Sequence, residues 1–252
     1  MPTEWTDPNS PIQIIEHQGF LVARDDLLGV GSKVRFVDRM IRDMPQNEIV
    51  FGSCPATGYA QISLPVVARR YGKTAHLFMA KRDMDKLHHY QHRGIELGAI
   101  YHWVKMGMLN VTKSHAKKYA EEDPANRFLL PLGLEHPSVL ESIVQVCHEQ
   151  IPLVPDHIWS VGSSGTLNRG LQQAYPDAEV HVVQVGHAMT PREIGRAIHH
   201  VSPYKFDRPV KPCDAPPFPS APTYDAKGWS VMVRWYETHP RPANVLYWNV
   251  AS

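Results

Sequence analysis

Short apolar runs alternate with amphipathic stretches along most of the chain. Stripes of apolar residues spaced three and four apart predict helices over 34–44, 62–71 and 138–150. Seven runs rich in β-branched or aromatic residues predict strands, at 19–23, 48–51, 74–79, 127–130, 157–161, 179–185 and 244–248. Strands that alternate with helices favour a largely parallel sheet covered by helices, so the pattern predicts an α/β protein.

Composition and net charge exclude several classes of protein and of binding partner. Hydrophobic residues make up 43% and charged residues 20% of the 252, close to globular averages, which argues against disorder and coiled coil. Lys plus Arg is 26 and Asp plus Glu is 25, a net charge of +1, so there is no electrostatic case for nucleic acid or an anionic membrane. A small basic stripe at Lys113, Lys117 and Lys118 leaves a nucleic-acid contact as an alternative.

Other features favour a cytoplasmic protein without a membrane segment. The chain has no apolar run of 18 residues, and its first residues are polar and acidic, unlike a signal peptide. Three widely spaced cysteines indicate neither a disulfide framework nor a thiolate zinc site. His88 and His92 have metal-ligand spacing, but their polar surroundings favour a solvated helix face, and we expect no metal. Seven prolines between 202 and 223 predict an ordered loop or a linker.

Lys33 is the first candidate for chemistry. It lies in Gly29-Val-Gly-Ser-Lys33-Val-Arg35, after a glycine-rich turn and at a predicted helix start. The positive end of a helix disfavours the ammonium and lowers the lysine pKa, as a Schiff-base lysine requires. The alternative is a solvated lysine at a helix start.

Three further loops are candidates for chemistry. Two of them join a predicted strand to a predicted helix, and the third precedes an amphipathic segment. In Gly162-Ser-Ser-Gly-Thr166, small residues and hydroxyls suit one phosphate at a helix N-terminus, and no lysine follows as a triphosphate loop requires. Gly52-Ser-Cys-Pro-Ala-Thr57-Gly58 is able to hold a carboxylate in the same way. Tyr224-Asp225 offers a carboxylate to a heterocyclic nitrogen. The alternatives are ordinary turns for the first two and an N-cap aspartate for the last.

In this order, the motifs resemble the pyridoxal-phosphate enzymes of fold type II, the tryptophan synthase β family. The resemblance is greatest to the aminocyclopropane-carboxylate deaminase and D-cysteine desulfhydrase branch. The segments that carry it are Ala23-Arg-Asp-Asp26, Gly31-Ser-Lys33-Val-Arg35, Arg127-Phe-Leu-Leu-Pro-Leu-Gly133, Asp156 to Thr166, Pro222-Thr-Tyr-Asp-Ala-Lys-Gly228 and Ala243-Asn-Val-Leu-Tyr-Trp-Asn249.

The resemblance implies two open, mostly parallel sheets flanked by helices, with pyridoxal 5′-phosphate in the cleft between them. It implies a larger cofactor-binding domain of 1–44 and 131–252, a smaller inserted domain of 45–130, and a homodimer. Lys33 would carry the cofactor as an internal aldimine, Thr57 would lie near the substrate carboxylate, and Tyr224 would act on a proton or the departing group. The other cofactor-binding residues would be Gly162, Ser163, Ser164, Gly165, Thr166, Asp225 and Asn249.

These features predict a lyase or deaminase that acts on a small amino acid. Two departures from the family keep other reactions open: Thr57 is the only hydroxyl among residues 56–58, and the family's second active-site tyrosine has no clear match, with Tyr204 and Phe218 in the right region. One alternative is a decarboxylase or replacement enzyme acting on a carrier-attached amino acid. Another is a catalytically silent relative that binds the cofactor or a partner. Asp207 and Asp214 are rivals to Asp225.

Overall fold

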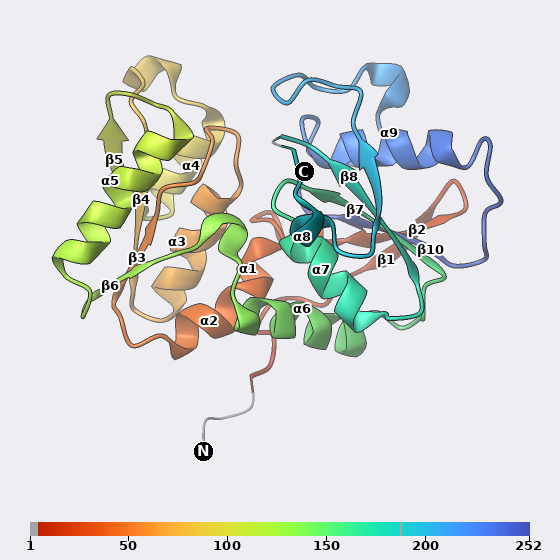
Figure 1. Cartoon of the computed structure of the whole chain (residues 1–252), viewed down its shortest axis with the longest axis horizontal. Helices are drawn as coiled ribbons and strands as arrows, with labels where there is room; N and C mark the ends of the chain where they lie inside the picture. The colour runs from red at the N-terminus through yellow and green to blue at the C-terminus, as the bar shows by residue number, and fades with distance from the viewer. Residues whose placement is uncertain (1–4, 187) are drawn as a thin grey trace. The chain divides into compact units, whose positions relative to one another are not determined.

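A computed structural model describes residues 5–186 and 188–252 of the chain. Its contacts divide the chain into two compact units. The larger unit comprises Asp7–Ser32 and Leu140–Ser252, and the smaller unit is built from residues 33–139 with the end of the N-terminal segment. Each unit is an open sheet flanked by helices (Figure 1).

The larger unit has a six-stranded sheet in the order β1-β2-β10-β7-β8-β9. β1 runs antiparallel to β2, and all other neighbours are parallel. The strands are β1 (Ile14–His17), β2 (Phe20–Arg24), β7 (His157–Gly162), β8 (Glu179–Gln184), β9 (Ile198–Val201) and β10 (Val245–Asn249).

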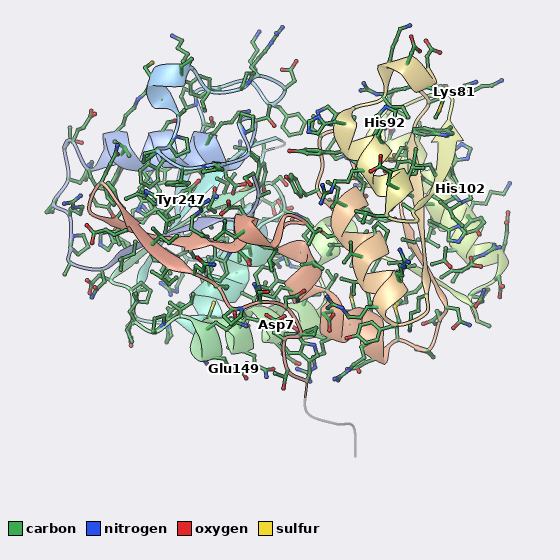
Figure 2. The ribbon with its side chains drawn as sticks, turned by 180° about the vertical axis from the view of Figure 1, so that it is seen from behind. Asp7, Lys81, His92, His102, Glu149 and Tyr247 are labelled. Carbon is green, nitrogen blue, oxygen red and sulfur yellow. The ribbon has the colours of Figure 1, made fainter. Side chains whose placement is uncertain are left out.

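Helices cover both faces of this sheet (Figure 1). Trp229 and Met232 of α9 pack against Trp159, Val161 and Tyr247 of the sheet, and the last of these is labelled in Figure 2. On the other face α7 packs so closely on α6 that a Cβ at Gly170 would lie 2.5 Å from Ile143. The helices, with two short 3-10 turns, are η1 (Asp25–Leu28), α6 (Pro137–Gln150), α7 (Thr166–Ala174), α8 (Pro191–Ile194), η4 (Pro212–Asp214) and α9 (Asp225–Trp235).

The smaller unit has a four-stranded, wholly parallel sheet in the order β5-β4-β3-β6. Val50, Phe78 and Val104 form its core with Ala116 and Ala120 of α5. The strands are β3 (Glu48–Phe51), β4 (Thr74–Ala80), β5 (Ile100–Val104) and β6 (Arg127–Leu129). The helices and 3-10 turns are α1 (Lys33–Phe36), α2 (Asp38–Asp43), α3 (Ala60–Arg70), η2 (Met84–Lys86), α4 (His89–Glu96), α5 (Leu109–Glu122) and η3 (Leu132–Leu134).

The predicted α/β class with two mostly parallel sheets is confirmed. All seven predicted strands are present within a residue or so of their predicted bounds. The helix predicted over 34–44 is divided at Val37 into α1 and α2. The contacts group residues 33–44 and 131–139 with the smaller unit, where α1 and α2 pack on α3, whereas the sequence analysis assigned them to the larger domain. The division at 1–44, 45–130 and 131–252 stays a prediction.

Two polar segments have local roles. The proline-rich residues 202–223 form an ordered loop, in which the Val210 N–H donates to the carbonyl of Pro222 over 3.0 Å. His88 is the N-cap of α4, and its ring accepts a hydrogen bond from the Tyr90 N–H. The His88 ring therefore caps the start of α4. Among residues 5–186 and 188–252, no helix has the length and apolar character needed to cross a membrane.

Candidate active site

The parallel strands β2, β10 and β7 are neighbours, so their carboxyl ends lie at one edge of the larger sheet. Such an edge, where neighbouring strands lead into connections on both faces, is the usual ligand site of open α/β sheets. Val250, directly after β10, connects two of the predicted segments. Its N–H donates to Asp225 Oδ1 over 3.2 Å, and its carbonyl accepts from the Ser32 N–H over 3.0 Å. Ser32 is bonded directly to Lys33.

Lys33 is the first residue of α1, as its sequence predicts, and is half-buried. The turn before it needs glycine, because Gly31 has a φ of +75°. Within the smaller unit the charge of Lys33 acts on the Cys54 thiol. Burial raises the pKa of that thiol to about 11, and Lys33 opposes the shift. Cys54 is therefore a neutral thiol close to the candidate lysine.

The loop from Gly52 to Gly58 joins β3 to α3, and buried side chains fix its shape. Gln61 is fully buried and donates to the carbonyls of Ala56 and Gly58 over 2.7 and 2.8 Å. The Cys54 thiol donates to the carbonyls of Pro55 and Gly58. Because several loop carbonyls are turned inward, the loop is a preformed turn in which Thr57 is half-buried. The sequence carried no signal for this role of Gln61, which depends on where the loop folds back.

The predicted phosphate loop joins β7 to α7. Gly165 is the N-cap of α7 with a φ of +69°, and no side chain caps the helix. A Cβ at Gly165 would lie 2.1 Å from the carbonyl oxygen of Glu193, so only glycine fits there. Ser163 and Ser164 are half-buried, and Thr166 is buried with its hydroxyl 3.5 Å from that of Ser164. The N-terminal N–H groups of this nine-residue helix have no intrahelical acceptors.

Tyr224 lies next to this phosphate loop. Its hydroxyl donates to the carbonyl of Val161 over 3.4 Å and is hydrogen-bonded by the side chain and backbone of Ser163. Burial raises the pKa of Tyr224 to about 12, although the bonds from Ser163 act in the opposite direction. The structure thus brings together two segments that the sequence analysis proposed separately. The role of Tyr224 in proton transfer stays a prediction.

Asp225 and Asn249 are both fully buried near the carboxyl end of β10. Asn249 accepts a hydrogen bond from Ser220 over 2.7 Å and donates to the carbonyl of Pro219 over 3.0 Å. Of the rivals to Asp225, Asp214 bonds with Tyr204 and Arg234, and Asp207 is exposed. Ser220 is a partner of Asn249 that the sequence analysis did not identify.

Within the larger unit these residues fit a pyridoxal phosphate. The glycine-only cap at Gly165, the hydroxyls beside it and the positive end of α7 suit a phosphate monoester. Asp225 is a fully buried carboxyl group, the kind of group that a protonated pyridine nitrogen would require as its partner. The predicted phosphate-binding and ring-binding residues therefore share one unit and one sheet edge.

Comparison with solved structures identifies the fold. The fold matches that of the ACC deaminase homologue, with a TM-score of 0.74, 15% identity, and coverage of 92% of this chain and 84% of that one. It also matches processed threonine deaminase isoform 2 from Solanum lycopersicum, with a TM-score of 0.70, 14% identity, and coverage of 96% and 78%. The chain thus has the fold of the fold type II pyridoxal-phosphate enzymes, and the predicted resemblance is confirmed at this level.

One curated protein is similar over nearly the whole chain. It is the glycyl-dTMP PLP-dependent decarboxylase of Pseudomonas phage M6, 24% identical over 285 residues that span 97% of this chain and 99% of that protein. No protein-family profile matches the chain.

Proposed function

We propose that the chain is a pyridoxal-phosphate-dependent enzyme whose cofactor is attached to Lys33. The observation that carries this proposal is the junction at Val250, which bonds to Asp225 on one side and to Ser32, the neighbour of Lys33, on the other. This junction lies at the carboxyl edge of the sheet in a fold shared with enzymes of this class.

The residues take distinct roles in this proposal. When bound, the cofactor supplies an electron sink for a bond broken at the α-carbon of an amino acid. Ser164, Gly165 and Thr166 hold the phosphate, while Asp225 keeps a proton on the ring nitrogen. Asn249 lines the cofactor site, where Ser220 and Pro219 fix its amide orientation.

On the substrate side, Lys33 moves a proton at the α-carbon once a substrate amine has displaced it. Thr57 and the loop whose shape Gln61 fixes bind the carboxylate of the substrate. In an elimination, Tyr224, whose raised pKa keeps it protonated at neutral pH, would donate a proton to the departing group, whereas the release of carbon dioxide requires no such proton.

For the reaction, we propose decarboxylation of an amino acid carried on a nucleotide. The support is the match to a glycyl-dTMP decarboxylase, which extends over 97% of this chain and 99% of that protein. In this reaction the bond from the α-carbon to the carboxylate breaks, carbon dioxide leaves, and the α-carbon gains a proton. The unusual sequence of the 52–58 loop is consistent with a substrate larger than a free amino acid.

A second candidate is a lyase or deaminase of a small amino acid. It is favoured by the names of two structural neighbours, an ACC deaminase homologue and a threonine deaminase. The two candidates differ in their products: carbon dioxide and a retained amine in the first, and ammonia with a keto acid in the second.

The products distinguish the two reactions directly. We would load the full chain with pyridoxal phosphate and offer glycyl-dTMP and, separately, a panel of small amino acids. The proposal predicts one carbon dioxide per glycyl-dTMP consumed and no ammonia, with loss of this activity in Lys33→Ala but not in Lys118→Ala, a change at an exposed lysine. Release of ammonia from a free amino acid would support the second candidate. A chain that binds no cofactor would overturn both.

A further inference from the structure

A cluster of metal-ligating side chains lies at the amino ends of β7 and β8. His157 and Glu179 are the first residues of these strands and are direct neighbours across the ladder. His181 follows two residues after Glu179 and therefore points to the same face of the sheet. His157 and Gly162 are the first and last of the six residues of β7. At about 3.3 Å per residue, the cluster therefore lies about 16 Å along the strand from the phosphate loop.

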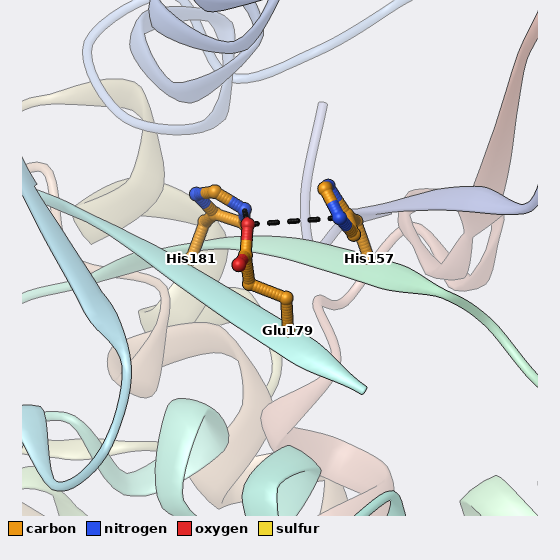
Figure 3. Close-up of side chains that lie close together, drawn as sticks. All are labelled: His157, Glu179 and His181. Atoms are coloured by element: carbon orange, nitrogen blue, oxygen red, sulfur yellow. Dashed lines mark ion pairs between the residues drawn. The ribbon is translucent and has the colours of Figure 1, made fainter. Parts of the chain in front are cut away.

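The Glu179 carboxylate lies between the rings of His157 and His181, as Figure 3 shows. Glu179 Oε1 lies 2.9 Å from His181 Nε2 and 3.6 Å from His157 Nε2, and all three ligand atoms lie within 4.8 Å of one another. Two ligands of a tetrahedral zinc ion are separated by about 3.3 to 3.6 Å, from zinc–ligand bonds of about 2.0–2.2 Å. The two separations from Glu179 Oε1, 2.9 and 3.6 Å, lie near that range.

His181 supplies the independent indication of a ligand. Its side chain is fully buried, yet its Nε2 makes no hydrogen bond although Glu179 Oε1 is 2.9 Å away. The oxygen therefore lies off the direction in which a ring N–H would point. A nitrogen and an oxygen that both bind one metal ion lie close together in this way without a hydrogen bond between them. Trp159 stacks on the His181 ring at 4.0 Å with planes 6° apart, which fixes the ring in place.

The outer nitrogens of both rings already have partners. His157 Nδ1 lies 2.8 Å from the Tyr236 hydroxyl, and His181 Nδ1 lies 3.0 Å from His200 Nε2. Metal-ligating histidines typically donate their second N–H in this way, which leaves the Nε2 lone pair for the ion. In the tautomers in which both Nδ1 atoms carry the proton, the two Nε2 lone pairs and the Glu179 carboxylate face one another and repel unless a cation lies between them.

We propose that His157, Glu179 and His181 bind a divalent transition-metal ion of the zinc class. Two imidazoles and one carboxylate suit zinc, cobalt or nickel better than calcium or magnesium, which prefer oxygen ligands. Half of the Glu179 side chain is exposed, so water completes the coordination. The ion joins two neighbouring strands of the larger unit, far from the cofactor residues, and thus stabilises the sheet rather than taking part in the reaction.

Zinc binding by the purified full chain tests this site. After dialysis against a chelator and then buffer, the chain is titrated with ZnCl2 by calorimetry, and its thermal midpoint is measured with and without zinc. We expect one zinc per chain and a rise in the midpoint. Glu179→Gln and His157→Gln, both at partly exposed side chains, should each weaken binding at least tenfold and remove the rise. His199→Gln, on an exposed histidine of β9, is the matched control and should behave as the wild type.

The two ligand variants act independently, so misfolding of one leaves the other as a test. If the wild type shows no saturable binding at micromolar zinc, the proposal is overturned. The same holds if a folded Glu179→Gln or His157→Gln variant binds zinc as tightly as the wild type, because the ion would then lie elsewhere.

Discussion

Asp225 Oδ1 accepts a hydrogen bond from the backbone N–H of Val250, 3.2 Å away, and so joins the start of α9 to the end of β10. The same peptide segment bonds back to Ser32 through the Val250 carbonyl. Three segments that are far apart in sequence are thereby held in register beside Lys33. This register ties Asp225 to the strand end that bonds Ser32, the residue before Lys33.

Asp225→Asn separates the structural role of this carboxylate from its chemical role. Asparagine keeps an oxygen for the Val250 N–H but has no negative charge to hold a ring proton. We expect the variant to keep its stability and its cofactor, and to lose at least tenfold in turnover. Asp225→Ala should in addition lose about 1–3 kcal/mol of unfolding free energy, because the Val250 N–H is left without its acceptor. Turnover of Asp225→Asn within twofold of the wild type would exclude the proposed role.

Gly165→Ala tests the predicted phosphate loop. A Cβ there would lie 2.1 Å from the Glu193 carbonyl oxygen, and the residue has a φ of +69°. We expect a loss of about 2 kcal/mol or more in stability and at least a tenfold loss in cofactor affinity. Gly72→Ala is the matched control, because Gly72 has a φ of +66° with open space around its Cβ position. Its cost should be only the backbone strain of about 1 kcal/mol. Equal costs in urea unfolding would contradict the steric explanation.

Lys227 gives a pH dependence of stability. Its side chain is fully buried on α9 and donates to the carbonyls of Lys205 and Phe206 over 2.8 and 2.9 Å. Burial lowers the pKa of Lys227 from 10.5 to about 8. Between these two values the unfolded chain binds the proton and the folded chain does not, so stability from this residue rises with pH. Below pH 8 the group is charged in both states and the penalty is complete.

Lys227→Met removes this titration. The unfolding free energy of the wild type minus that of the variant should therefore increase between pH 8 and 10, measured by urea denaturation at each pH. A constant difference over this range would show that Lys227 has an ordinary pKa in the folded protein.

The three cysteines should differ in reactivity. Cys54 and Cys147 are buried, and burial raises the pKa of each thiol, while Cys213 is exposed. The thiolate is the reactive form, so the native protein should show one rapidly titrating thiol and the denatured protein three. Cys213→Ser should remove the rapid reaction with a chromogenic disulfide. A rapid reaction that persists in this variant would indicate that Cys54 or Cys147 is accessible.

The sequence predicted four of the six strands of the larger sheet because β2, β7, β8 and β10 are mostly apolar runs of five or six residues. β1, β5 and β9 were not predicted. His102 of β5, labelled in Figure 2, and His199 and His200 of β9 interrupt the apolar pattern, and β1 has only four residues, two of them polar. Lys33 and the 162–166 loop were predictable because glycines that lie just before a predicted helix indicate a tight turn, and Gly31 and Gly165 indeed have a positive φ. Gln61 and Ser220 were not, because their roles depend on where distant backbone carbonyls and Asn249 come to lie.

The sequence contains only a weak signal for the histidine and glutamate cluster. Glu179 and His181 alternate along one strand and so share a face, but the partner His157 is recognised only once β7 is known to lie beside β8 in this register. Pairing between parallel strands depends on the whole sheet, and local pattern does not determine it.

The central claim is that Lys33 carries the cofactor, and chemical trapping tests it most directly. The full chain loaded with pyridoxal phosphate is reduced with borohydride, digested, and mapped by mass spectrometry. The account predicts one pyridoxyl group per chain on the peptide that contains Lys33, and its absence from Lys33→Ala. Stoichiometric labelling of Lys227 or another lysine, with Lys33 unmodified, would contradict it.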